Sequence, residues 1–184
     1  LRPSDLDGDL ADRRAALVRL SGLDANVASQ HQVAESKSEE WLVRWVDVVM
    51  PNVGDLANMV TPVLIVSRAP AMPRPGVLLL PGHGQAHDSK ASLRAMRRLA
   101  DAGFTVALPE LFDSGRRNAN GNNHDNANRL PPLGRSPLGP FATSWLHGEQ
   151  VLRAAGDLVS AGPIGLMGWS FGGTSSMWLA AMAQ

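Results

Sequence analysis

The sequence has no cysteine, no surplus of charge of either sign and no long apolar run. Without cysteine the chain can form neither a disulfide nor a thiolate metal site, and it has no cysteine nucleophile. Its 17 basic and 17 acidic side chains cancel, which argues against binding nucleic acid or an anionic membrane through bulk charge. No apolar run approaches the roughly 18–20 residues that a membrane-spanning helix needs. We therefore expect neither a nucleic-acid partner nor a membrane span.

The remaining composition is typical of one globular domain. Of the 184 residues, 44% are hydrophobic and 18% are charged, which distinguishes the chain from disordered sequences. The chain begins at Leu1 without a basic and apolar leader, so we expect its start to follow a processing event or an artificial boundary. Composition leaves the compartment and the oligomeric state open, because cytoplasmic and secreted proteins can both lack cysteine.

The N-terminal third of the chain predicts a helix, a connection and a pair of strands. Residues 1–22 carry leucines at helical spacing and end on a glycine, a pattern typical of a helix and its C-terminal cap. Residues 24–40 are polar without a sustained period, and we expect them to be a connection. Residues 41–50 and 59–67 are rich in apolar and β-branched side chains. The Pro- and Gly-containing stretch between them, residues 51–58, predicts a hairpin turn.

Further along the chain, short apolar runs alternate with helical patterns. Runs that are apolar throughout are typical of parallel strands buried on both faces. The runs are residues 77–80, 104–108 and 164–167, and the helical patterns cover residues 89–102, 144–160 and 171–182. We therefore predict an α/β fold with a mostly parallel sheet and helices on both faces.

Two boundaries follow from these patterns. We assign residues 1–40 to an N-terminal helix and connection, and residues 41–184 to the main domain. Within that domain, residues 114–140 are rich in Asn, Gly and Pro and show no periodicity. Such a long irregular connection is more often a functional insertion or a mobile loop than a simple link.

One motif carries chemistry. The third apolar run leads into Gly168-Trp169-Ser170-Phe171-Gly172 and then into a helix, which is the G-x-S-x-G pattern between a strand and a helix. A sharp turn there would lift the Ser170 hydroxyl above the sheet in a strained conformation, and side chains two positions away would collide. We predict Ser170 as the nucleophile and the Phe171 peptide N–H, at the helix N-terminus, as an oxyanion donor. The alternative is a glycine-rich turn with an incidental serine.

A second glycine-containing loop supports this interpretation. The first apolar run ends in Pro81-Gly82-His83-Gly84, and an oxyanion hole needs a second backbone N–H from the loop after a neighbouring strand. We predict His83 as that donor, with Gly84 or Gln85 next, although a simple strand-to-helix turn would show the same residues. Trp169, adjacent to the nucleophile, is a candidate for lining the substrate pocket.

The segments LLLPGHG, LADAGFTVALPEL and IGLMGWSFGGTSSMWLAA together resemble the N-terminal half of an α/β-hydrolase. With GRSPLGPFATSWLHGEQVLRAA, they look most like the dienelactone-hydrolase and acetyl-xylan-esterase-related group of bacterial esterases. Two positions depart from the pattern of the family: Pro81 stands where many members have His, and Glu110 where Asp is common. GWSFGG is also similar to the corresponding turn of prolyl-oligopeptidase-type peptidases, so a peptidase remains an alternative.

The resemblance implies a serine hydrolase that cleaves carboxylic esters of small molecules, of acetyl-ester or lactone type, through an acyl-enzyme on Ser170. No cofactor is implied. In this fold the acid and the His of the triad follow the serine, so we expect both beyond residue 184, and the sheet to be truncated after the helix that follows Ser170. The 184-residue chain alone should then be nearly inactive.

Other assignments of the polar residues were weighed. We expect the five histidines to lie in loops or at the surface and none to act as the triad base. His83, His87 and Asp88 have the spacing of a metal cluster only on a helix, and Gly84 argues against one there, so we expect no metal site. A non-catalytic α/β-hydrolase-fold protein that binds a ligand or partner is the alternative outside the enzymes.

Overall fold

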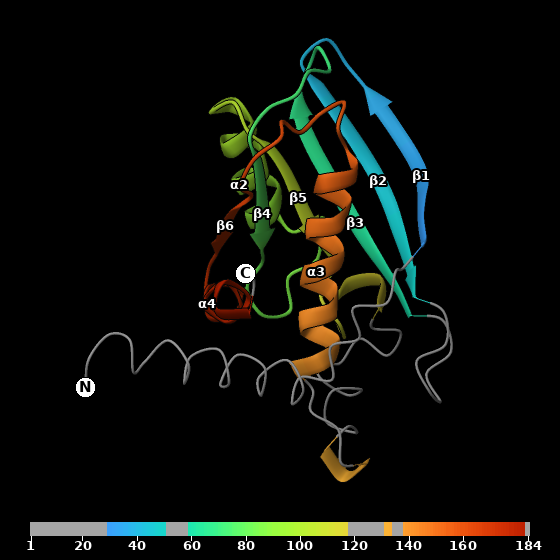
Figure 1. The fold of residues 1–184 in the computed structure, drawn as a ribbon, viewed down its shortest axis with the longest axis vertical. Helices are drawn as coiled ribbons and strands as arrows, with labels where there is room; N and C mark the ends of the chain where they lie inside the picture. The colour runs from blue at the N-terminus through green and yellow to red at the C-terminus, as the bar shows by residue number, and fades with distance from the viewer. Residues whose placement is uncertain (1–28, 51–58, 118–130, 134–137, 183–184) are drawn as a thin grey trace, which may run out of the picture.

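The computed structural model describes residues 29–50, 59–117, 131–133 and 138–182. The helix predicted over residues 1–22 and the turn predicted over 51–58 lie outside the described residues. The described part of the chain forms one six-stranded sheet with the order β1-β2-β3-β5-β4-β6. Figure 1 shows β1 and β6 at the two edges of this sheet, with α3 lying across it.

The first three strands form an antiparallel meander. Strands β1 (Ser29–Lys37), β2 (Trp41–Met50) and β3 (Met59–Arg68) pair in sequence order. The prediction for the last two was confirmed. The connection expected over residues 24–40 was wrong, because β1 lies within it. Between residues 30 and 37 every side chain of β1 except that of Glu35 is exposed, so the strand lacks the apolar alternation by which strands are recognised.

Strands β4 (Gly76–Leu80), β5 (Thr105–Pro109) and β6 (Gly165–Gly168) form the parallel part of the sheet. Each lies within one residue of a predicted apolar run. However, β3 joins β5 in the antiparallel sense, and the sheet is therefore mixed, not mostly parallel as predicted. An apolar run reveals that a strand is buried but carries no information about its direction, which is why the orientation of β3 was missed.

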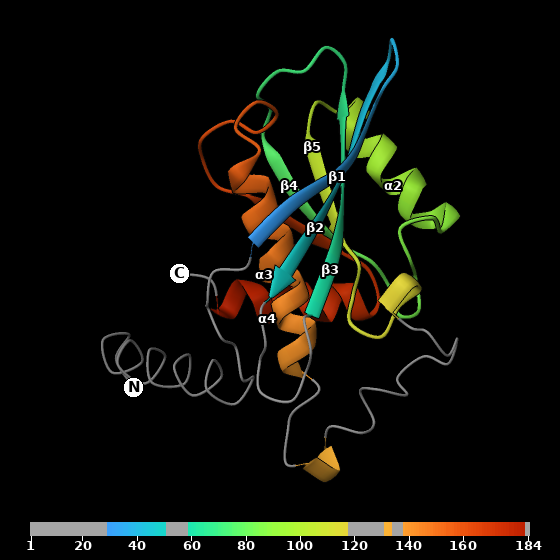
Figure 2. The ribbon, with the colours of Figure 1, turned by 90° about the vertical axis from the view of Figure 1, so that its right-hand side faces the viewer.

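The helices lie on both faces of the sheet, as predicted. Helix α2 (Lys90–Asp101) begins at a Ser89 cap whose hydroxyl oxygen accepts the Ser92 N–H at 3.1 Å. Helix α4 (Phe171–Met182) has the predicted bounds. Figure 2 shows α2 on the opposite side of the sheet from α3.

Helix α3 (Leu138–Ala154) begins and ends six residues before the range predicted for it. Its first turn contains Gly139 and Pro140, which obscured the helical pattern, although proline is tolerated in a first helical turn. The helix thus starts inside the segment expected to be irregular. The described part of that segment also contains two short 3-10 turns, η1 (Gly115–Arg117) and η3 (Pro131–Leu133).

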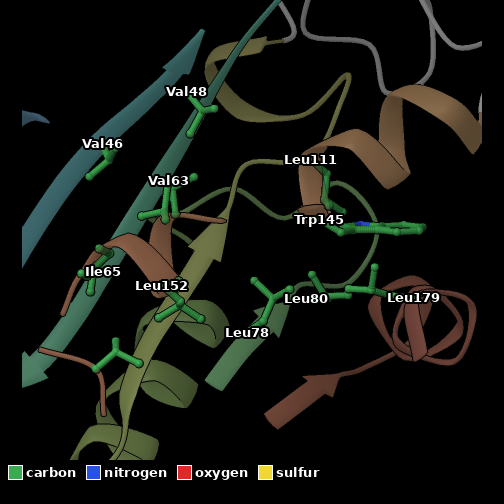
Figure 3. Close-up of a cluster of buried hydrophobic side chains, with 14 of the residues drawn as sticks. Val46, Val48, Val63, Ile65, Leu78, Leu80, Leu111, Trp145, Leu152 and Leu179 are labelled. Atoms are coloured by element: carbon green, nitrogen blue, oxygen red, sulfur yellow. The ribbon is translucent and has the colours of Figure 1, made fainter. Parts of the chain in front are cut away.

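Two apolar clusters hold the helices to the sheet. On one face, α3 and α4 pack on the strands through a core that contains Trp145 and Leu152 (Figure 3). A β-carbon on Gly148 of α3 would lie 2.6 Å from the Leu78 side chain, so glycine lets this helix approach β4 closely. On the other face, Met96 and Ala100 of α2 are fully buried against the strands.

The β6 edge of the sheet is less well covered. Side chains of β6 alternate between exposed and half-buried, and Met167 is 45% exposed. On the neighbouring α4, Met177 and Trp178 are 75% and 37% exposed. Among the described residues no further strand pairs with the outer edge of β6. Within the same residues, no helix is both long and apolar enough to cross a membrane.

Candidate active site

Ser170 lies at a sharp turn between β6 and α4. Its side chain is exposed and its backbone has a φ of +52°, which is uncommon for a residue other than glycine. The turn passes directly into the helix, because the Thr174 N–H donates to the Ser170 carbonyl at 3.1 Å. The strained backbone that the motif predicts at Ser170 is thus present in the structure.

The two motif glycines are required by close backbone contacts. A β-carbon on Gly168 would collide with the carbonyl group of Gly172, and one on Gly172 would collide with the carbonyl of Leu80 at the end of β4. In both cases the obstacle is backbone, which cannot move aside as a flexible side chain can. The steric reason given for these glycines from the sequence is therefore confirmed, and the start of α4 is packed onto the end of β4.

The β4–α2 loop (residues 81–89) lies beside this turn. Because Leu80 of β4 is paired with Gly168 of β6, the two segments leave the sheet at neighbouring positions. The Gln85 N–H donates to the Gly82 carbonyl at 3.2 Å, and Gly84 has a φ of +66°. The exposed His83 ring lies edge to face with that of Phe171, with centroids 6.0 Å apart. The structure thus brings together Ser170 and the residues predicted as the two oxyanion donors.

Trp169 points to the other side of the turn. Its indole packs with the apolar cluster on the α2 face, and a β-carbon on Gly82 would lie 2.9 Å from its Nε1 atom. Trp169 also lines a groove of about 450 Å³ between α2 and β6. The groove is lined by Ala91, Arg94, Ala95, Arg98, Leu99, Met167 and Trp169. Any contact of Trp169 with a substrate would therefore be made through this groove.

On the α3 side of the turn, aromatic rings form a continuous row. Phe171 lies 5.0 Å from Phe141, which in turn lies 5.9 Å from Phe112, both edge to face. Sequence analysis did not identify Phe112 or Phe141. Neither stands in a motif, and Phe141 begins a stretch whose helical pattern was recognised only three residues later.

Two buried ionisable side chains, His87 of the β4–α2 loop and Glu110 after β5, lie next to each other. Burial lowers the pKa of His87 to about 4. The pKa of Glu110 is raised by burial, against the opposing effect of the Arg116 N–H, which donates to Oε1 at 3.0 Å. A cavity of about 310 Å³ adjoins the pair and is also lined by Trp45, Asp88 and Arg116. Burial therefore shifts both side chains toward their neutral forms.

His147 is buried elsewhere, between α3 and β3. Its Nδ1 lies 2.9 Å from the Thr61 hydroxyl, and burial lowers its pKa to about 4, with a further lowering by the charge of Arg117. His124 lies outside the described residues. Among the residues that are described, no group of three or more His, Asp or Glu side chains is arranged to hold a metal ion.

No protein-family model and no curated protein matches the sequence. Solved structures match the fold. A protein from Bacteroides fragilis NCTC 9343, assigned as an acetyl xylan esterase, matches with a TM-score of 0.78 and 16% identity over 99% of this chain and 52% of that chain. Acetyl xylan esterase 1 from Thermoanaerobacterium sp. JW/SL YS485 matches with a TM-score of 0.62 and 15% identity, over 95% of this chain and 54% of that chain. A glucuronoyl esterase from Solibacter usitatus matches with a TM-score of 0.63 and 15% identity, over 93% of this chain and 55% of that chain.

These similarities define the class of fold. The fold of the chain, an α/β architecture with a mixed sheet, is similar to that of these solved structures. It spans about half the length of these solved structures, as the covered shares of 52–55% show. At about 15% identity the likeness concerns the fold alone, so the chemistry has to be argued from the residues of this chain.

Proposed function

We propose that the protein is a serine hydrolase that cleaves carboxylic esters, with Ser170 as its nucleophile. One observation carries the proposal: an exposed serine with a φ of +52° stands on a strand-to-helix turn that only glycines at 168 and 172 permit. Backbone strain of this kind persists where the surrounding structure enforces it, and it is found most often at functional sites. An incidental serine in a glycine-rich turn would need neither the strain nor the two close contacts.

In the proposed reaction, the Ser170 Oγ attacks the acyl carbon while a base takes its proton. The N–H of Phe171 lies at the N-terminus of α4, where unpaired peptide groups and the helix dipole favour negative charge. With the N–H of His83 it would hold the tetrahedral oxyanion. Collapse of the intermediate expels the alcohol, which takes up the proton, and water then releases the acid from Ser170.

The base and its acid partner are the part of the triad that we assign outside this chain. His87 and His147 are buried and already engaged with the Leu108 carbonyl and the Thr61 hydroxyl. We propose that the full-length protein supplies both groups after residue 184, as the order of the triad in this fold requires. The solved structures of similar fold, each about twice as long as the matched region, support this.

For the substrate, we propose an ester carried by a carbohydrate. The similar structures include two named as acetyl xylan esterases and one as a glucuronoyl esterase. In this chain the half-buried ring of Phe171, which directly follows Ser170, packs edge to face on the buried Phe141, and an apolar ring next to the nucleophile suits a short acyl group or one face of a sugar. Trp169 remains a candidate substrate contact through the groove between α2 and β6.

A fluorophosphonate probe on the full-length protein tests the nucleophile. We expect the probe to label Ser170, and labelling to be lost in Ser170→Ala but kept in Ser36→Ala, which removes an exposed hydroxyl from β1. Hydrolysis of p-nitrophenyl acetate and of acetylated xylan should be lost together with labelling. An unlabelled Ser170 in an active enzyme would refute the proposal. Faster cleavage of a proline anilide than of short esters would favour the peptidase alternative. Binding of a ligand without turnover would favour the non-catalytic binding protein.

A further inference from the structure

His87 and Glu110 take no part in the reaction proposed above, although both are almost completely buried. Their exposed fractions are 3% and 2%. His87 stands in the β4–α2 loop, and Glu110 directly follows β5. The His87 Nδ1 atom lies 3.7 Å from the Glu110 Oε1 atom. Buried polar groups destabilise a fold unless they are paired, so the contacts of these two side chains indicate what they do.

His87 anchors the end of the β4–α2 loop to the sheet. Its Nε2 lies 2.8 Å from the Leu108 carbonyl of β5. Because a carbonyl oxygen only accepts, Nε2 carries the proton of the neutral ring. Nδ1 is then an acceptor that faces the Glu110 carboxyl. The ring also packs edge to face on Trp45 of β2, with centroids 5.2 Å apart. Three contacts from different segments therefore fix one side chain of the loop.

Glu110 connects the same region to the turn at η1. Its Oε1 accepts the Arg116 N–H at 3.0 Å, and its backbone carbonyl accepts from the Arg117 guanidinium at 3.0 Å. Gly115, with a φ of +51°, passes so close that a β-carbon there would collide with the carboxyl group and lie 3.0 Å from the Ala86 side chain. The carboxyl is thus enclosed between η1 and the β4–α2 loop.

The second oxygen of Glu110 shows that this arrangement is not explained by hydrogen bonding alone. Oε2 is buried and has no hydrogen-bond partner among the described residues, and the Arg116 Nε lies 3.9 Å away. An apolar side chain of similar size would avoid this unpaired atom. A carboxyl reaches both segments through one atom, because Oε1 accepts the Arg116 N–H of η1 and lies 3.7 Å from the His87 Nδ1 of the β4–α2 loop.

We propose that His87 and Glu110 are positioning residues that together hold the β4–α2 loop in the conformation that presents the His83 peptide N–H beside Ser170. The catalytic consequence rests on the proposed esterase function; the effect on the loop does not. Loss of the pair should leave the sheet intact and free the loop. The loss should therefore reduce stabilisation of the transition state more than binding of the ester.

Amide hydrogen exchange of residues 81–89 in the full-length protein tests the positioning directly. We expect His87→Ala to speed exchange in this loop at least about 10-fold, as local opening without global unfolding does. The matched control is His147→Ala, which removes another buried histidine whose side chain contacts Thr61 instead. It should leave residues 81–89 protected. Unchanged protection in His87→Ala would overturn the proposal.

A second pair of variants covers the case in which His87→Ala does not fold. His87→Phe keeps a ring against Trp45 but removes both ring nitrogens, and we expect faster loop exchange as in the alanine variant. Glu110→Gln keeps the size of the side chain and an acceptor for the Arg116 N–H, so it should keep the loop protected. Two results would contradict the pairing. One is a loop in His87→Phe that exchanges as slowly as in the wild type, and the other is a loop in Glu110→Gln that exchanges as fast as in His87→Phe.

Kinetics separate this proposal from the proposed function. In an active enzyme, His87→Phe should lower kcat by about 10- to 100-fold with KM changed less than about 2-fold, a fraction of what removal of an oxyanion donor causes. A rise in KM at constant kcat would overturn the catalytic part. A wild-type enzyme without esterase activity would refute the proposed function, while the exchange experiment would still decide whether the pair holds the loop.

Discussion

The carbonyl group of Leu80, the last residue of β4, occupies the space that a side chain at Gly172 would need. This contact is where the beginning of α4 meets the end of the neighbouring parallel strand. It brings the turn that contains Ser170 next to the β4–α2 loop. The end of β4 and the start of α4 are almost a hundred residues apart in the sequence. Here they meet backbone against backbone, with no side chain between them.

Replacement of Gly172 should therefore be much more damaging than replacement of its neighbour. We expect Gly172→Ala to lower the free energy of unfolding by about 3 kcal/mol, since the new methyl group forces backbone apart. Gly173→Ala is the matched control, because a β-carbon there would lie 3.5 Å from the nearest atom, an ordinary contact. It should leave stability unchanged or raise it by up to about 1 kcal/mol through helix propensity. Equal effects in urea unfolding would contradict the packing described for this turn.

Ser170 itself is expected to contribute to chemistry and not to stability. Ser170→Ala should abolish ester hydrolysis while changing the free energy of unfolding by less than about 0.5 kcal/mol. The left-handed backbone conformation destabilises a residue with a side chain by roughly 1–2 kcal/mol, and Ser170→Gly removes this strain. Glycine also has greater freedom in the unfolded chain, which opposes the gain. We therefore expect Ser170→Gly to raise the free energy of unfolding only slightly. Thermal unfolding of both variants checks this. A large fall in melting temperature for either would indicate that the serine holds the turn together.

The buried histidines predict a loss of stability in mild acid. Burial lowers the pKa values of His87 and His147 from 6.5 to about 4. Between these values the unfolded chain binds protons that the folded chain does not. Stability due to these groups is therefore complete above about pH 6.5 and is lost as the pH falls to about 4, by about 3 kcal/mol for each histidine. Arg116 and Asp88 face His87, and Arg117 faces His147.

Urea unfolding at pH 7 and pH 4.5 measures this loss. His147→Gln should make the difference in unfolding free energy between the two pH values smaller, and the double variant with His87→Phe should make it smaller still. The raised pKa of Glu110 acts in the opposite direction, because the folded state holds that proton as the pH rises above 4.5. An unchanged pH dependence in the double variant would show that other groups control acid unfolding.

The features that the sequence predicted correctly are local ones. The turn at Ser170 follows from the spacing of Gly168 and Gly172, because a side chain at Gly168 would collide with the Gly172 carbonyl within the motif. Helix α2 follows from its apolar period, and the bounds of α4 from the residues after Ser170. These patterns each lie within a few residues of the chain, where pattern and structure coincide. The contact of Gly172 with Leu80, in contrast, joins segments that are distant in the sequence.

The features that were missed depend on contacts between distant segments. The side chains of β1 show no apolar period because nearly all of them are exposed, and the strand is held mainly by its backbone pairing with β2. Gly139 and Pro140 concealed the first turn of α3. The direction of β3 beside β5 is set by pairing partners that no local pattern specifies. The contact of His87 with Glu110 likewise exists only because β5 pairs with β4. The sequence analysis named both residues for other reasons and did not indicate that they lie together.

The weakly covered β6 edge predicts how the 184-residue polypeptide behaves when it is produced alone. An unpaired strand edge with exposed apolar side chains favours association with another copy. We therefore expect concentration-dependent self-association, measured by sedimentation velocity. Met167→Lys, which places a charge on β6, should reduce it. The matched control is Met72→Lys: Met72 is 49% exposed, against 45% for Met167, but lies in the connection before β4. If both lysine variants suppress association equally, net charge and not the β6 edge is responsible.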